Sequence, residues 1–358
     1  MNLGARALEL LSIPSVIGHE GALADFVEAW ARRHFRDDEV VRVSHSLCLG
    51  HRDDPRPSVA LVGHLDTVPA HPEGNPPRLE GDRLHGLGAS DMKGSLAVMM
   101  ALVETLDLAT LPVNLRLVFY EREEGPFLQS GLGPLFERVP ELAKLHFAIA
   151  MEPTDGAVQV GCVGTLHATV RFEGVAAHSA RPWQGRNAIH AAGPVLTALG
   201  ARQRHEVKVG EHAFYEVMSA TTASGGRARN VVPDAFEFNL NYRFAPGKSL
   251  ETAQADVRAL VGDQASVTFT DLAPSGRVCD DNPLYQRLVA RTGRAPEAKQ
   301  AWTDVARFSE WGVDAVNYGP GETAQAHQRH ESASVKALDE AFEVLAAVLR
   351  GEALVEMQ

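Results

Sequence analysis

Apolar residues in the first part of the chain alternate between short continuous runs and helix-spaced stretches. The continuous runs lie at 58–63 (SVALVG), 113–120 (VNLRLVFY) and 146–151 (HFAIAM). Their length and their β-rich composition favour buried strands. Helix-spaced apolar residues occupy the stretches 3–12, 20–34, 92–107 and 131–137. Continuous apolar strands that alternate with helices predict an α/β fold, in which a mostly parallel mixed sheet is covered by helices on both faces.

A different pattern follows the third run. The elements predicted there are a strand at 166–173, a helix near 187–199, a strand at 235–243, a helix near 249–260 and a strand at 265–271. After residue 276 the chain returns to helix, strand and helix, and its last helix is amphipathic. This final segment is too short to fold alone. We therefore predict one domain in two pieces, 1–164 and 277–358, interrupted by an inserted α+β domain at 165–276.

Composition narrows the class of protein. With 45% hydrophobic and 22% charged residues, the 358-residue chain has the make-up of a globular protein. A formal net charge of −12 without any Lys/Arg block argues against a nucleic-acid partner. Because we find neither a signal-peptide pattern nor a run near the roughly 18 apolar residues of a membrane span, we expect a cytoplasmic protein without membrane association. The isolated Cys48, Cys162 and Cys279 suit neither a disulfide framework nor a thiolate metal site.

Candidate metal-binding side chains follow each of the three apolar runs. His64 and Asp66 follow the first run, Glu123 and Glu124 the second, and Glu152 the third. In an open parallel sheet the carboxyl ends of the strands share one edge, where ligands bind. The strand ends should therefore bring a histidine and several carboxylates to one place. Taken singly, such residues are more often structural or solvated than functional.

The spacing within these groups indicates roles. Residues two apart on a strand end point the same way, so Asp66 can orient the ring of His64 as the outer partner of a metal-binding histidine does. Adjacent Glu123 and Glu124 point to opposite sides, so one can bind metal while the other serves as a base. Asp91 follows a GLGAS stretch, precedes a helix and can bridge two ions. GLGAS itself lacks the GxGxxG spacing of a nucleotide site.

Five motifs stand in order along the chain: GHLDTVP at 63–69, GASDMKG at 88–94, EEG at 123–125, MEPT at 151–154 and AHQRHE at 326–331. Together with GVAAHSARPW, RNVVPD and YGPG, this set resembles the metallopeptidase and deacylase family that contains succinyl-diaminopimelate desuccinylase, acetylornithine deacetylase and glutamate carboxypeptidases. The resemblance covers nearly the whole chain. It implies a zinc-aminopeptidase-like catalytic domain with an inserted, ferredoxin-like dimerisation domain.

The same resemblance implies a centre of two divalent metal ions. It assigns Asp91 as the ligand that bridges the two ions. His64 and Glu152 are the expected further ligands of one ion, and Glu124 and His327 those of the other. Nitrogen and oxygen donors of this kind suit zinc, cobalt or manganese, and we expect zinc. His330 lies in the same motif as the last of these ligands and is an alternative to it.

Further roles are implied by the family pattern. Glu123 is the expected general base, with Asp66 beside it in the catalytic set. His178, in the AHSARPW motif, is expected to donate a hydrogen bond into the site of a partner subunit in a homodimer. Asn230 in RNVVPD and Arg243 in NLNYRF match the family's positions for binding the substrate carboxylate, and Arg307 in TDVARF is a second candidate. Arginine suits this task because its planar fork binds a carboxylate through two hydrogen bonds.

Within the family, the MEPTDG and AHSARPWQGRNAIHAA stretches most resemble the desuccinylases of bacterial lysine and cell-wall biosynthesis. The expected reaction is hydrolysis of N-succinyl-LL-2,6-diaminopimelate to succinate and LL-diaminopimelate. Acetylornithine deacetylase, a carboxypeptidase and an aminoacylase are alternatives, because pocket size and charge decide between acyl groups. An alternative of another class is a non-catalytic, metal-binding homologue. Loss of Glu123 or of a ligand would favour it, and the sequence retains them all.

Overall fold

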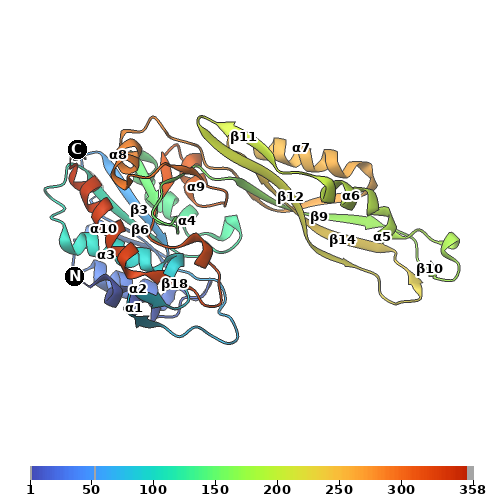
Figure 1. Cartoon of the computed structure of the whole chain (residues 1–358), viewed down its shortest axis with the longest axis horizontal. Coiled ribbons are helices and arrows are strands. Elements are labelled where there is room, and N and C mark those ends of the chain that lie inside the picture. The colour runs from blue at the N-terminus through green and yellow to red at the C-terminus, as the bar shows by residue number, and fades with distance from the viewer. Residues whose placement is uncertain (1, 52–53, 353–358) are drawn as a thin grey trace. The chain divides into compact units, whose positions relative to one another are not determined.

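The computed structural model describes residues 2–51 and 54–352. The chain divides into two compact units, each with its own hydrophobic core (Figure 1). The first unit contains Met1–Gly161, Arg277–Ala298 and Thr303–Gln358, and the second contains Cys162–Gly276 and Lys299–Trp302. The second unit is thus built mainly from one continuous segment. No helix among the described residues is long and apolar enough to cross a membrane.

The first unit is a layered α/β structure. Its eight-stranded sheet has the order β1-β2-β6-β3-β7-β17-β8-β16. The strands of this sheet are β1 (Val40–Val43), β2 (Ser46–Leu49), β3 (Ser58–His64), β6 (Asn114–Tyr120), β7 (Phe147–Ala150), β8 (Gln159–Val160), β16 (Glu297–Ala298) and β17 (Ala315–Asn317). A smaller sheet contains β4 (Arg78–Glu80), β5 (Arg83–His85) and β18 (Ser332–Ser334). The α-helices are α1 (Leu3–Leu11), α2 (Gly21–Ala31), α3 (Gly94–Thr105), α4 (Leu132–Arg138), α8 (Pro283–Thr292), α9 (Val305–Glu310) and α10 (Val335–Arg350).

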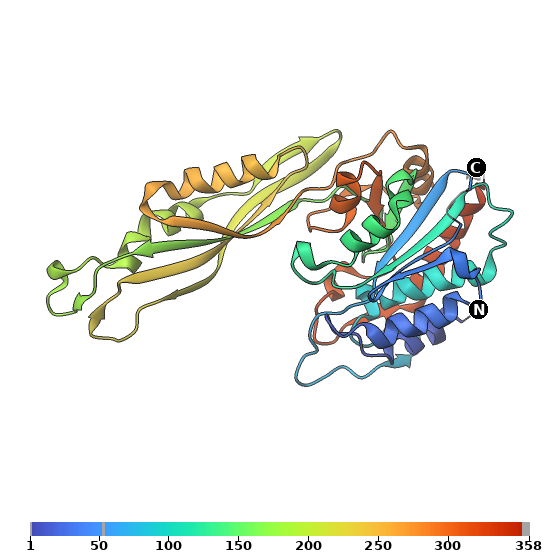
Figure 2. The ribbon, with the colours of Figure 1, turned by 180° about the vertical axis from the view of Figure 1, so that it is seen from behind.

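Parallel pairing in the middle of the large sheet brings distant segments side by side. β3 pairs in parallel with both β6 and β7, and β7 pairs in parallel with β17. Side chains alternate between the two faces of these strands. Val59 and Leu61 of β3 join the core formed with α1, α2, α3 and α10. Ala60 and Val62 are buried on the opposite face, where α4 and α9 lie (Figure 2). Burial on both faces explains the continuous apolar runs of the sequence.

Polar residues at the helix ends account for where several helices begin and stop. The side chain of Asn2 accepts a hydrogen bond from a backbone N–H in the first turn of α1. Asn282 does the same for α8, and Ser334 for α10. These caps satisfy donors that have no partner within the helix. α10 ends at Arg350 and is followed by Gly351, whose φ of 68° suits the left-handed conformation of a helix terminus.

The second unit is an antiparallel sheet with helices packed against it. Its five strands have the order β11-β12-β14-β9-β15. They are β9 (Gly164–Glu173), β11 (His205–Val209), β12 (His212–Gly225), β14 (Ala235–Phe244) and β15 (Ser266–Ala273), and the α-helices are α5 (Ala188–Ala191), α6 (Gly193–Ala201) and α7 (Leu250–Val261). Two short strands, β10 (Ala177–His178) and β13 (Val231–Val232), pair separately. Alternate residues such as Val170, Phe238 and Leu240 form the core with the helices.

The predicted α/β class with a mostly parallel mixed sheet is confirmed. Two details of the second unit differ from the prediction. The single helix predicted near 187–199 is two helices, α5 and α6, because Pro194 in the first turn of α6 cannot donate to a preceding turn. The strands β11 and β12 are not predicted at all. Residues 219–225 of β12 are exposed and mostly small or polar, so the apolar alternation that marks a strand is missing there.

Candidate metal centre

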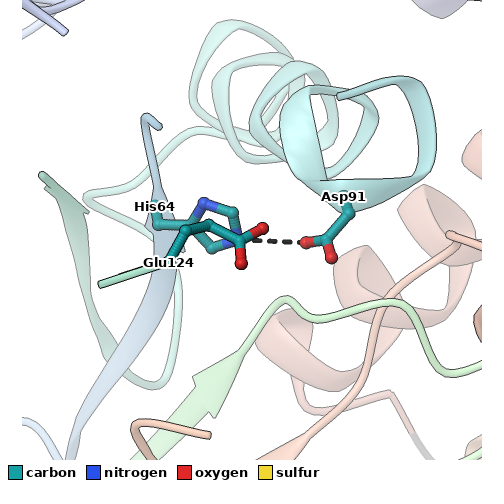
Figure 3. Close-up of side chains that lie close together, drawn as sticks. All are labelled: His64, Asp91 and Glu124. Atoms are coloured by element: carbon teal, nitrogen blue, oxygen red, sulfur yellow. Dashed lines mark hydrogen bonds and ion pairs between the residues drawn. The ribbon is translucent and has the colours of Figure 1, made fainter. Parts of the chain in front are cut away.

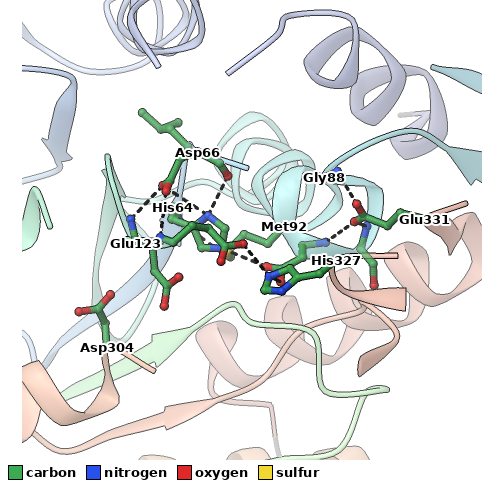
Figure 4. Close-up of polar contacts among 12 residues, drawn as sticks. His64, Asp66, Gly88, Met92, Glu123, Asp304, His327 and Glu331 are labelled. Atoms are coloured by element: carbon green, nitrogen blue, oxygen red, sulfur yellow. Dashed lines mark hydrogen bonds and ion pairs between the residues drawn. The ribbon is translucent and has the colours of Figure 1, made fainter. Parts of the chain in front are cut away.

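Three neighbouring strands end at one edge of the large sheet and carry polar side chains there. β3 ends at His64 and is followed by Asp66, β6 ends just before the segment 121–124, and β7 is followed closely by Glu152. Because β3 lies between β6 and β7 and is parallel to both, their carboxyl ends meet. Figure 4 shows His64, Asp66 and Glu123 gathered at this edge.

His64, Asp91 and Glu124 form a group that can hold a metal ion. One ligand atom from each side chain lies within 4.8 Å of the other two (Figure 3). Nε2 of His64 is 3.0 Å from Oδ1 of Asp91, and both residues are buried. Asp91 lies in the irregular helix η2 (Ala89–Lys93), where its φ of −126° and ψ of 89° depart from helical values. The fold thus assembles three predicted ligands from three separate segments.

His327 approaches the same group from the C-terminal part of the chain. Its Nε2 atom is 2.9 Å from Oε1 of Glu124 and 3.5 Å from Oδ2 of Asp91. The hydrogen bond with Glu124 raises the pKa of His327 to about 9. Asp91 therefore faces one imidazole through each carboxylate oxygen, an arrangement that suits a carboxylate shared by two cations. His327 and the alternative ligand His330 are both exposed, and it is the contacts with Glu124 and Asp91 that favour His327.

Two more acidic residues, Glu123 and Glu152, lie close to this group. Glu152 is buried at the end of β7. Burial raises the pKa of Glu123 well above its ordinary value, and the charge of the nearby Glu152 raises it further. Together with Asp91 and Glu124, four carboxylates therefore lie close to one another with little water around them. Such like charges repel strongly unless cations neutralise them. The donors are all oxygen and nitrogen atoms, so the site fits divalent ions such as zinc.

Asp66 holds the segment that carries the two glutamates. Its buried carboxylate accepts hydrogen bonds from the backbone N–H groups of Glu123, at 3.0 Å, and Glu124, at 2.9 Å. Nδ1 of His64 donates to the backbone oxygen of Asp66 at 3.0 Å and lies 3.6 Å from its carboxylate. Asp66 thus orients His64 mainly through its main chain. Its side chain serves the neighbouring loop, a role that the spacing of the two residues did not predict.

Two further buried acids support the site and were missed by the sequence analysis. Glu331 accepts three backbone hydrogen bonds from the segment 88–91. Asp304 accepts a hydrogen bond from the hydroxyl of Tyr120 at 2.7 Å and another from Nε of Arg307 at 2.8 Å. A signal for Glu331 was present, because this residue closes the AHQRHE motif. Asp304 lies three residues before Arg307 in TDVARF, and its residue type and spacing gave no signal of a role.

Arg307, a predicted ligand of the substrate carboxylate, belongs to α9 in the first unit. It is 6% exposed. Besides its bond to Asp304, it donates from Nη2 to the backbone oxygen of Phe127 at 2.8 Å. Its guanidinium carbon lies 4.0 Å from the centre of the Phe127 ring. The side chain is therefore held next to the loop that carries Glu123.

The other predicted substrate and donor residues belong to the second unit. His178 lies on β10 and pairs with Val231 of β13. Asn230 directly precedes β13, so the exposed His178 and Asn230 are neighbours on this short ribbon. Arg243 is half-buried on β14, and its Nε donates to Oδ1 of Asn241 at 3.2 Å. The structure brings His178 and Asn230 together, whereas Arg243 lies elsewhere in the unit.

A family model described as peptidase family M20/M25/M40 matches residues 60–351. The chain belongs to this family. It is 39% identical over 344 residues to a Mycobacterium tuberculosis protein provisionally named succinyl-diaminopimelate desuccinylase, with 96% of each chain covered. It is 34% identical over 351 residues to the succinyl-diaminopimelate desuccinylase of Corynebacterium glutamicum, with 94% of this chain and 93% of the relative covered.

Solved structures share the fold over nearly the whole chain. Aminopeptidase PepT from Bacillus cereus has a TM-score of 0.77 at 17% identity, with 98% of this chain and 97% of the other covered. A dinuclear metal-binding peptidase of the M20 family from Bacillus subtilis has a TM-score of 0.71 at 17% identity, with 97% and 96% covered. As a member of this family with a clustered donor set, the present chain is a hydrolase with a divalent metal cofactor.

Asp66→Asn should lower kcat by about tenfold to a hundredfold, the usual cost of losing a group that orients metal ligands. Asn keeps the size of Asp but has one acceptor oxygen in place of two, so one of the bonds to the Glu123 and Glu124 N–H groups is lost. Steady-state hydrolysis of an N-acyl amino acid by the metal-loaded variant measures the effect. Asp25→Asn is the control, because the Asp25 side chain is 70% exposed. Equal activity of the two variants would contradict the role.

Proposed function

We propose that this enzyme hydrolyses the amide bond of N-succinyl-LL-2,6-diaminopimelate and releases succinate and LL-diaminopimelate. The observation that carries the proposal is the near full-length likeness, at 39% and 34% identity, to two relatives that bear the name of this activity. The assembled donor set supports it, because amide hydrolysis by this route needs a metal centre and a free base. Acetylornithine deacetylation and peptide hydrolysis remain the alternatives within the family.

We propose two divalent ions at the centre, zinc in the first place and cobalt or manganese as substitutes. Asp91 would be the ligand shared by both ions, His64 and Glu152 would hold one of them, and Glu124 and His327 would hold the other. The approach of His64 and His327 to opposite oxygens of Asp91 supports this allocation. When bound, the two ions polarise the scissile carbonyl and lower the pKa of the attacking water.

Glu123 is the proposed general base. Its backbone is held by Asp66, and its neighbour Glu124 contacts His327. Burial and the charge of Glu152 raise the pKa of Glu123, and cations bound beside it would lower that pKa, so the two effects oppose each other. A buried carboxylate next to the metal site that is not itself a ligand is placed to accept a proton. Glu123 therefore takes a proton from the attacking water and then delivers that proton to the leaving nitrogen.

Asn230, Arg243 and Arg307 are the proposed ligands of the substrate carboxylates. Arg307 is oriented in advance by its bonds to Asp304 and to the main chain of Phe127. A guanidinium that is already held loses less conformational entropy when it binds a carboxylate. This residue therefore supports both substrate binding and the position of the loop beside it.

We further propose a homodimer that forms through the second unit, with His178 of one copy acting in the site of the other. Residues 219–225 of β12 are exposed and are in register only with β14 among the described strands. Such a strand edge is able to pair with a second chain. Nδ1 of His178 accepts the N–H of Ala180 at 3.0 Å. A neutral ring in this state carries its hydrogen on Nε2, which can donate to a substrate oxygen.

A substrate panel tests the proposed reaction. The purified, zinc-loaded enzyme should hydrolyse N-succinyl-LL-2,6-diaminopimelate with a kcat/KM about tenfold or more above that for N-acetylornithine and small dipeptides, because a polar pocket discriminates strongly against a ligand that lacks the matching charged group. Initial rates of amine release give the comparison. Faster hydrolysis of N-acetylornithine would contradict the proposed reaction and indicate an acetylornithine deacetylase.

Glu123→Ala should abolish turnover and leave the metal content at the wild-type level. The residue is proposed as base and not as ligand, so its loss removes proton transfer without opening the metal site. Mass-spectrometric metal analysis of the same preparation separates the two effects. Glu124→Ala is the matched comparison: it removes a proposed ligand and should lower the metal content. Loss of both ions from the Glu123 variant would refute its role as a free base.

Mixed dimers test the shared site. His178→Ala and Glu123→Ala are each expected to be inactive alone. When the two variants are unfolded together and refolded at equal amounts, half of the dimers combine both chains and carry one complete site, so roughly a quarter of wild-type activity should return, as two-fold symmetry requires. Size-exclusion chromatography with light scattering checks the dimer. A monomeric enzyme, or mixtures that stay inactive, would exclude the arrangement.

A further inference from the structure

Glu331 joins two parts of the centre that lie far apart along the chain. It follows His327 by four residues and is 1% exposed. Its Oε1 atom accepts hydrogen bonds from the backbone N–H groups of Ser90, at 2.8 Å, and Asp91, at 2.9 Å. Its Oε2 atom accepts from the N–H of Gly88 at 2.7 Å (Figure 4). One side chain therefore holds the whole turn that presents Asp91.

A carboxylate is the side chain that suits this position. The backbone turns at Gly88, with a φ of 86°, and departs from helical values at Asp91, so that N–H groups of this segment point to one side. Two charged oxygens can accept all three N–H bonds, and charge-assisted bonds of this kind are strong. Glutamine has one acceptor oxygen and would turn its own N–H groups toward these donors. Aspartate is shorter by one methylene group.

The segment that carries Glu331 is itself held in place by backbone hydrogen bonds and by strand pairing. The backbone oxygen of Glu331 accepts a hydrogen bond from Gly86 N–H at 3.1 Å and one from Nδ2 of Asn75 at 2.8 Å. Directly after it, β18 pairs with β5, with Ser332 opposite His85. Glu331 therefore connects the turn before α3 with a strand edge that is already paired. A shift of the turn before α3 would therefore have to move the strand β18 as well.

We propose that Glu331 is a positioning residue of the metal centre. It keeps the carboxylate of Asp91 in register with the imidazole of His327, which lies on the same loop as Glu331. The distance of 3.5 Å between Oδ2 of Asp91 and Nε2 of His327 depends on this link, as does the contact of Asp91 with His64 on the other side. The inference rests on the proposed two-metal function. It adds the residue that sets the spacing between Asp91 and His327.

Metal affinity is the property that tests this role. Glu331→Gln in the full-length enzyme should bind zinc about tenfold to a hundredfold more weakly than wild type, the range seen when outer partners of metal ligands are lost. Titration against buffered free zinc, read out as metal content, gives the affinity. At saturating zinc the variant should show a lower kcat with an unchanged KM, because no substrate contact is removed. Glu340→Gln is the control, since the Glu340 side chain is 59% exposed on α10.

A buried acid with a purely structural role would behave differently. It would lower the melting temperatures of the metal-free and the zinc-loaded protein alike and leave zinc affinity at the wild-type value, and that result would overturn the inference. If Glu331→Gln does not fold, Glu331→Asp keeps the charge, shortens the reach and should show the same loss of affinity. Failure of the wild-type enzyme itself to bind divalent metal would overturn the proposed centre, whereas normal binding by both Glu331 variants would overturn only the role of Glu331.

Discussion

Repulsion between carboxylates that share a poorly solvated place is the constraint on which the first unit depends. Asp91, the adjacent Glu123 and Glu124, and Glu152 come from three separate segments and meet at the carboxyl edge of the large sheet. Burial and the charge of Glu152 raise the pKa of Glu123 in this cluster. Without cations the repulsion between the four acids would weaken the fold around them. Divalent ions bound between the carboxylates replace this repulsion by attraction between the carboxylates and the cations. The charge that is costly in the metal-free protein becomes the source of affinity in the loaded one.

Two other buried acids position the cluster by accepting hydrogen bonds from backbone N–H groups and not from side chains. Asp66 binds two successive N–H groups beneath the glutamate loop, and Glu331 binds three N–H groups beneath Asp91. Backbone donors are useful for this purpose because they are present at every residue and cannot rotate away. A ligand whose backbone is held has few side-chain torsions left to order when a cation arrives.

Much of the fold could be read from the sequence, and the exceptions have physical reasons. β3, which ends at His64, and β7, which ends two residues before Glu152, are almost entirely apolar because both faces of the sheet are covered, so they stand out as continuous runs. β12 does not stand out, because the part from Ser219 onward is exposed and mostly small or polar. The role of Asp66 was also predicted incompletely, because sequence spacing indicates where a side chain points and not which backbone groups lie around it.

The sequence by itself determined the class of the fold, the ordered motifs and the types of donor atom, because these depend on local periodicity and on the chemistry of single side chains. The tertiary structure alone decided which donors face one another. His327 contacts Glu124 across 203 positions, and Glu331 meets Asp91 across 240, and no local pattern encodes either distance. The contact of Glu331 with Asp91 accompanies the pairing of β18 with β5, and Glu124 follows β6, which pairs in parallel with β3. Both pairings are long-range arrangements that only the folded chain establishes.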